Sequence, residues 1–138
     1  MFMLKTKWIP VFLLCFVLTG CTTAESLIDY KGKGEGEVFV CTASYKRAYE
    51  TAISTLKKRR LKILRKDKDK GYIIASDTIR LFNGGGRIAV YVYELGPSKT
   101  QIEVYSKPYF FIPTPTIYLA AHKRDIEIRD AIREAING

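Results

Sequence analysis

The strongest constraint on the fold is a strict alternation of apolar and other residues over two neighbouring segments, 87–94 and 100–106. Successive side chains of an extended chain point to opposite faces, so this period predicts two strands rather than a helix. The turn signal at 96–99 predicts that they form an antiparallel hairpin. One face of the hairpin is aliphatic, with Ile88, Val90, Val92, Ile102 and Val104. The other face carries Ala89, Tyr91, Tyr93, Glu103 and Tyr105. An antiparallel sheet with one face on a core alternates in this way.

The flanking segments supply the other elements. Apolar residues recur at helical spacing over 44–59, with Ser44 as the N-cap, and again over 120–136. Segments 38–41, 61–65 and 72–76 read as strands. The chain of 138 residues is long enough for one domain. The sequence therefore predicts an α+β two-layer sandwich of order β-α-β-β-β-β-α, with an antiparallel sheet of four to five strands packed by two helices.

The N-terminus has the features of an export signal. A basic start precedes the apolar run 8–18, which as a helix spans about 17 Å, against about 30 Å of bilayer hydrocarbon. A short apolar run followed by small residues indicates a secretory signal. The sequence Leu18-Thr19-Gly20-Cys21 resembles the lipobox of bacterial lipoproteins. The resemblance implies cleavage between Gly20 and Cys21, with diacylglycerol on the Cys21 thiol.

Two other interpretations of this segment remain, an ordinary secreted protein and a retained membrane anchor. Thr22 stands where an Asp commonly retains Gram-negative lipoproteins in the inner membrane, so the resemblance favours the outer membrane if the host is Gram-negative. Export disfavours nucleic acid as a partner, although the net charge is +9. The expected organisation is a signal peptide at 1–20, a lipidated, Gly-spaced flexible tether at 21–37 and a folded domain at 38–138.

The folded part also resembles a known class of domains. A strand, an Ala-rich amphipathic helix and the segment 61–75, LKILRKDKDKGYIIA, are similar to small periplasmic lipoprotein domains. These include the helix-grip domains of lipoprotein C of the outer-membrane β-barrel assembly machinery. The resemblance covers residues 38–106, supports the fold and a non-enzymatic role, and carries over no functional residues.

Residues that could carry catalysis or bind a metal are sparse. His122 is the single histidine, which favours an exposed or capping side chain over a metal ligand. Cys41 has no obvious base and reads as a small buried hydrophobe at a strand end, with an intermolecular disulfide as an alternative. Asp125, Glu127 and Asp130 alternate with cations and read as a solvated helix face. We therefore expect no catalytic residues, no metal and no cofactor.

A basic cluster follows the first helix, at Lys57, Lys58, Arg59, Arg60 and Lys62. It is either a solvated helix end or a contact surface for anionic lipid headgroups, lipopolysaccharide phosphates or an acidic partner. Cations also suit the C-terminal end of a helix dipole.

Aromatic residues suggest a second contact surface. The segment 107–119 is apolar but contains three prolines, so it either covers the edge of the core or contacts a partner or membrane. Together with the tyrosines of the hairpin it gives the predicted partner or membrane contacts Tyr91, Tyr93, Tyr105, Tyr109, Phe110 and Phe111.

These features predict a lipid-anchored envelope lipoprotein that acts as a non-catalytic adaptor or accessory subunit with an envelope protein partner. The alternative is a small-ligand or lipid-binding domain, with a cavity lined by Tyr45, Tyr49 and the strand valines. An enzyme is the third interpretation. The partner, the ligand and the oligomeric state do not follow from the sequence.

Overall fold

The computed structural model describes residues 27–76, 86–108 and 115–138. Within them the predicted order β-α-β-β-β-β-α is confirmed. The elements are β1 (Glu37–Cys41), α3 (Tyr45–Lys58), β2 (Lys62–Asp67), β3 (Tyr72–Ser76), β4 (Gly86–Gly96), β5 (Lys99–Pro108) and α4 (Pro115–Asn137). The signal peptide, Cys21 and Tyr109, Phe110 and Phe111 lie outside the described residues.

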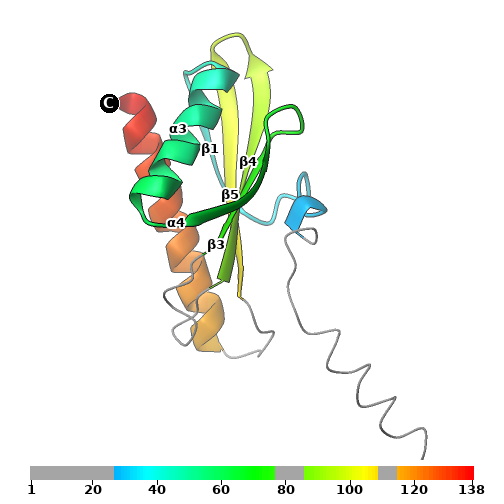
Figure 1. Cartoon of the computed structure of the whole chain (residues 1–138), viewed down its shortest axis with the longest axis vertical. Coiled ribbons are helices and arrows are strands. Elements are labelled where there is room, and N and C mark those ends of the chain that lie inside the picture. Colours follow the sequence, from blue (N-terminus) through cyan, green and yellow to red (C-terminus); the bar gives the residue numbers. More distant parts are fainter. Residues whose placement is uncertain (1–26, 77–85, 109–114) are drawn as a thin grey trace, which may run out of the picture.

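The five strands form one antiparallel sheet in the order β1-β5-β4-β3-β2. The predicted hairpin is the pair β4–β5, in which Val90 lies opposite Val104 and Tyr91 opposite Glu103. Helices α3 and α4 lie side by side on one face of the sheet, and a short N-terminal turn lies on the other (Figure 1). We call these the helical face and the open face.

The alternation predicted from the sequence divides the buried residues between the two faces. The aliphatic residues of the hairpin pack under both helices with Phe39, Leu56, Ile128 and Ile132. The other residues of the alternation, among them Ala89 and Tyr91, form a smaller cluster on the open face. Burial of apolar area on both faces, at roughly 25 cal/mol per Å², therefore stabilises the sheet.

Helix α3 begins and ends as its sequence predicts. Ser44 is the N-cap, and its Oγ accepts a hydrogen bond from the Arg47 amide at 3.3 Å. At the other end, the Leu61 amide donates to Leu56 O at 3.1 Å and the Arg60 amide to Lys57 O at 3.0 Å. These two bonds make a Schellman motif, whose left-handed position Arg60 occupies with φ of 62°.

Helix α4 begins at Pro115, five residues before the predicted start at 120. We expected the prolines of 107–119 to exclude a helix interior, and the observed position agrees with that rule. Proline is well suited to the first helical position, where its missing N–H has no intrahelical partner. The sequence pattern therefore placed the start of this helix too late.

Candidate contact surfaces on the two sides of the sheet

The N-terminal turn, residues 27–33, covers the middle of the open face. Leu27 is 0% exposed and packs among Tyr72, Ile74, Ala89 and Tyr91. The Tyr91 hydroxyl donates a hydrogen bond to Leu27 O. Strand β4, which carries Tyr91, is the middle strand of the sheet. The turn therefore sits over the centre of the open face.

Aromatic and cationic side chains hold the turn from two sides. The ring of Tyr30 stacks on Tyr105 with centroids 5.1 Å apart. Lys33 Nζ and Lys107 Nζ lie 4.7 and 5.0 Å from the centre of the Tyr30 ring. Ring stacking and cation–π contacts of this kind each contribute about 0.5–1.5 kcal/mol.

Lys31 fixes the other end of the turn. Its Nζ lies 5.2 Å from the centre of the Tyr93 ring and donates a hydrogen bond to Lys70 O. The Gly32 amide donates to the Tyr93 hydroxyl at 2.8 Å. Burial lowers the pKa of Lys31 from its usual range, while the nearby Asp67 carboxylate opposes that shift. The turn is thus attached to three neighbouring strands.

This arrangement corrects two expectations. Tyr91 was predicted to contact a partner or membrane, and this prediction is wrong. Its side chain is 0% exposed because Leu27 covers it. Burial raises the pKa of Tyr91 above its ordinary value and that of Tyr105 to about 12. Tyr93 and Tyr105 are partly buried under the same turn. The predicted flexible tether 21–37 is accordingly wrong for residues 27–33, because these pack on the sheet.

The edge strand β1 exposes aliphatic side chains on the open face. Val38 and Val40 are 41% and 51% exposed. They lie beside Glu103 and Gln101 in the register of β1 with β5, and so on the face that carries Tyr91 and Tyr93. The Glu103 side chain is 3% exposed, and its burial raises the pKa of the carboxyl.

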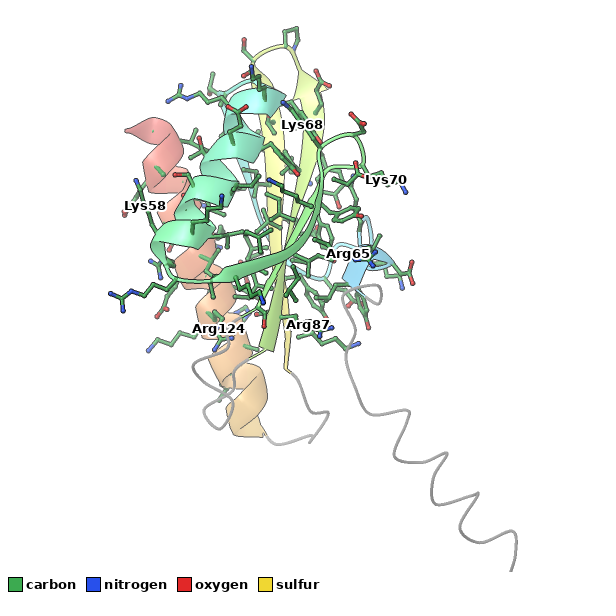
Figure 2. All side chains as sticks on the ribbon, in the orientation of Figure 1. Lys58, Arg65, Lys68, Lys70, Arg87 and Arg124 are labelled. Atoms are coloured by element: carbon green, nitrogen blue, oxygen red, sulfur yellow. The ribbon has the colours of Figure 1, made fainter. Side chains whose placement is uncertain are left out.

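The predicted basic cluster is exposed at every position: Lys57, Lys58, Arg59, Arg60 and Lys62. It surrounds the junction of α3 and β2, and Figure 2 shows Lys58 on the helical side, away from Arg65 and Lys70 beside the N-terminal turn. The sheet therefore separates Lys58 from the turn, whereas Lys62 lies opposite Ser76 in the register of β2 with β3 and so on the open face.

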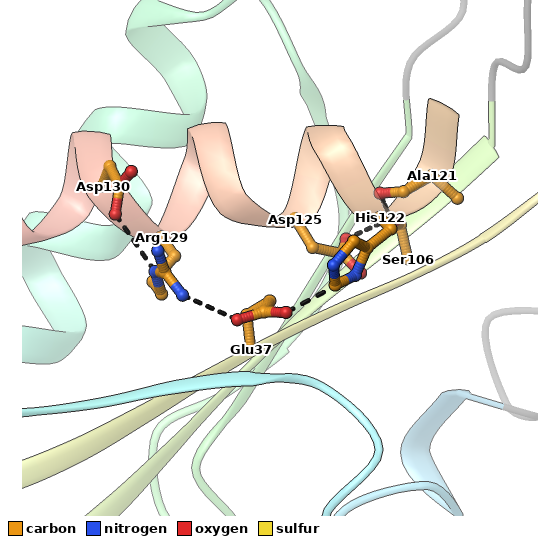
Figure 3. Close-up of polar contacts among 7 residues, drawn as sticks. All are labelled: Glu37, Ser106, Ala121, His122, Asp125, Arg129 and Asp130. Carbon is orange, nitrogen blue, oxygen red and sulfur yellow. Dashed lines mark hydrogen bonds and ion pairs between the residues drawn. The ribbon is translucent and has the colours of Figure 1, made fainter. Parts of the chain in front are cut away.

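A polar network, drawn in Figure 3, joins α4 to the sheet. Glu37 of β1 bridges two residues of α4, accepting from Arg129 Nη1 at 2.6 Å and lying 3.4 Å from His122 Nδ1. Arg129 Nε also donates to Asp130 at 3.0 Å. His122 is largely exposed, as predicted, although it lies beside a carboxylate.

Asp125 is the buried member of this network, and the prediction of a solvated position for it is wrong. It is 6% exposed and pairs with the Ser106 hydroxyl of β5. Burial raises its pKa to about 6, although the Ser106 contacts and His122 favour the charged form. Ser106 Oγ also lies 3.2 Å from Ala121 O. A hydroxyl has one hydrogen, so Ser106 can donate to Ala121 O while it is paired with Asp125 only when Asp125 is protonated and donates to Ser106.

The helical periodicity alone could not reveal this site, because Glu127 and Asp130 on the same helix remain outside the core. The signal that could have found it is the unusual Ser106 on the aliphatic face of β5. That side chain continues the row of Ile102 and Val104 and needs a polar partner once it is buried.

The other candidate residues have structural surroundings. Cys41 is 7% exposed, as predicted, and its Sγ donates to Thr100 O at 3.4 Å. Burial raises the pKa of the thiol. Among the described residues, His, Cys, Asp and Glu form no group of three or more that could hold a metal ion. In the same part of the chain, no helix is long and apolar enough to cross a membrane.

Comparisons with known proteins assign this chain to no family. No protein-family model and no curated protein matches the chain. Among solved structures, the adenylate sensor from AMP-activated protein kinase complexed with ATP is 12% identical, with a TM-score of 0.49 over 72% of this chain and 94% of that one. The Zhui aromatase/cyclase from Streptomyces sp. R1128 is also 12% identical, with a TM-score of 0.39 over 72% of this chain and 90% of that one. These likenesses are too weak to assign a ligand or an activity.

Proposed function

We propose that this protein is a lipid-anchored lipoprotein of the cell envelope, attached through Cys21 to the periplasmic face of the outer membrane if the host is Gram-negative. It acts as a non-catalytic adaptor that binds an acidic envelope partner. The lipobox supports the anchor. The exposed basic cluster at the end of α3 supports the partner surface, because clustered cations attract a complementary acidic surface.

The observation that carries the partner surface is the backbone of Arg60. A left-handed conformation with φ of 62° is unfavourable for a residue with a Cβ, and helices usually end with Gly at this position. Strain of this kind concentrates at functional positions. A cation therefore stands at the centre of the cluster where a glycine would stabilise the helix end.

The alternative, a ligand-binding domain, has less support from the packing. Tyr49 is 4% exposed and belongs to the core beside Val90, Val92 and Val104, at the place where a ligand cavity was expected. Tyr45 stacks on Tyr49 at 6.2 Å and lines a surface hollow of about 540 Å³ beside the β2–β3 turn. That hollow lies outside the space between the sheet and the helices.

Photo-crosslinking in intact cells tests the adaptor. Probes replace Lys58 and Arg59, and a control probe replaces the exposed Glu134 of α4. We expect one protein to be recovered from the two cluster positions and not from position 134. Recovery of lipid alone, or of the same products at all three positions, would refute the adaptor. The anchor is tested separately by the mass of the N-terminal peptide and by its loss in Cys21→Ala.

A further inference from the structure

We propose that the open face of the sheet lies against the membrane, so that the protein is held in one orientation with its helices, and Lys58 of the basic cluster, turned away from the lipid. This inference rests on the proposed lipid anchor. Its evidence is the position of the N-terminal turn, which limits where the anchor can lie relative to the domain.

The link between anchor and domain is short. Only five residues separate Cys21 from the buried Leu27, and the six steps from one to the other span at most about 20 Å. A tether ending at residue 37 would have been more than twice as long. The lipid surface must therefore lie within about 20 Å of the centre of the open face.

The helical layer is out of reach of such a link. A route from Leu27 around the sheet first crosses half the sheet, which is two strand spacings or about 10 Å. It then passes the sheet and one layer of helices, which adds about 20 Å. The sum, about 30 Å, exceeds the reach of the link. The membrane can therefore lie on the open face or at a sheet edge, but not under the helices.

The residues around the turn favour the face itself. Val38 and Val40 expose aliphatic side chains there. The cations on this face or its rim are Lys31, Lys33, Lys62, Arg65, Lys70, Arg87 and Lys107, three of which Figure 2 labels. The carboxylates are Asp29, Glu35, Asp67, Asp69 and Glu103. Glu103 is buried, and Asp67 Oδ1 accepts from two amides of its own turn at 3.0 Å.

The partly apolar, cationic surface suits the headgroup region of an anionic bilayer. Lys33 and Lys107 flank Tyr30 at the centre of this surface. Tyrosine is favoured at the membrane interface because one end of its side chain is apolar and the other is polar. The same orientation exposes Lys58 and its neighbours to a partner on the far side of the sheet.

Site-directed fluorescence on the lipidated full-length protein tests this orientation. Cysteines for labelling replace Val40 on the open face and Ser54 and Lys58 on the helical side, all of which are exposed. The native Cys41 is buried, which keeps it from the label. The protein is reconstituted in phosphatidylcholine vesicles containing phosphatidylglycerol and headgroup spin-labelled lipid.

We expect quenching at position 40 to be at least about threefold that at positions 54 and 58, because the helical surface lies roughly 20 Å further from the open face. The double substitution Lys33→Gln, Lys107→Gln should lower the quenching at position 40 to that at position 54. The matched control carries Lys46→Gln and Lys58→Gln on α3. Measured at positions 40 and 54, it should keep the difference in quenching. Thermal melting of each variant confirms that the fold is kept.

Equal quenching at all positions, or stronger quenching on the helices, would overturn the proposed orientation. If Cys21 in the same sample carries lipid, that result would not contradict the proposed anchor. Persistence of the difference in the Lys33, Lys107 variant would overturn the role of the open-face cations. A sample whose N-terminal peptide carries no lipid would overturn the proposed anchor and the inference together.

Discussion

Removing the Leu27 side chain is expected to release the N-terminal turn from the sheet. Leu27 is 0% exposed and fills the centre of the open-face cluster. Leu→Ala at a fully buried position costs about 2–5 kcal/mol, which includes both lost transfer free energy and the cavity left behind. We take the lower part of that range, about 2–4 kcal/mol, because a peripheral turn can relax.

The lost free energy should appear first as local detachment of the N-terminal turn from the sheet. At 1.4 kcal/mol for each factor of ten, 2–4 kcal/mol raises the undocked fraction about 30- to 1,000-fold. Native-state hydrogen exchange measures this at the Gly32 amide, which donates to the Tyr93 hydroxyl only while the turn is docked. The melting temperature should fall as well, by roughly 4 °C per kcal/mol for a domain of this size.

Leu119→Ala is the matched control, since Leu119 is 69% exposed on α4. A substitution at such a site is usually within about 0.5 kcal/mol of neutral. If Leu27→Ala matched Leu119→Ala in both exchange and melting, the turn would not be docked in solution. The short link between anchor and domain would then be wrong too.

Three further outcomes follow from particular contacts. Asp125 has a folded pKa of about 6 against an ordinary 3.8, so its contribution to stability is present below about pH 4 and is lost as the pH rises to 6, a change of roughly 3 kcal/mol. Urea unfolding should show that Asp125→Asn removes this fall in the free energy of unfolding. The same difference in unfolding free energy between pH 4 and pH 7 in Asp125→Asn as in the unsubstituted protein would contradict this assignment. Gly71→Ala should destabilise the fold by more than about 2 kcal/mol, since φ is +71° and a Cβ would collide with Val92 O. Gly34 has a similar φ of +69° but lies in open space, so Gly34→Ala should cost only about 1–2 kcal/mol. Equal melting temperatures of the two variants would exclude the collision. Arg60→Gly should stabilise the domain by about 0.5–1 kcal/mol in thermal melting while weakening the crosslink from position 58, and a loss of stability would show that the left-handed arginine is not strained.

Most of the layered fold could be predicted from local patterns. The period of two residues assigned the hairpin side chains at 88–93 and 102–105 to the two faces, because successive side chains of a strand point to opposite sides of the sheet. The same logic placed α3 together with its N-cap Ser44. The fifth strand was uncertain because β1 has five residues and little context, and its pairing with β5 depends on residues about sixty positions away.

The contact surfaces were predicted only in part. The basic cluster of 57–62 is exposed as expected, because consecutive charged side chains are costly to bury. The tyrosines of the open face were placed correctly on that face but wrongly as a free surface. The segment that covers them is polar and Gly-spaced, with no periodicity to indicate that Leu27 and Tyr30 would pack.

By itself, the sequence determined the two faces of the sheet, the helices that cover one of them and the position of the candidate lipidated Cys21, since each depends on residues close together in the chain. Only the tertiary structure decided what lies over the other face and which carboxyl groups are buried. Leu27 meets Tyr91 across 64 positions, and Asp125 meets Ser106 across 19. Contacts of this kind depend on how the elements pack against one another, which no local period encodes.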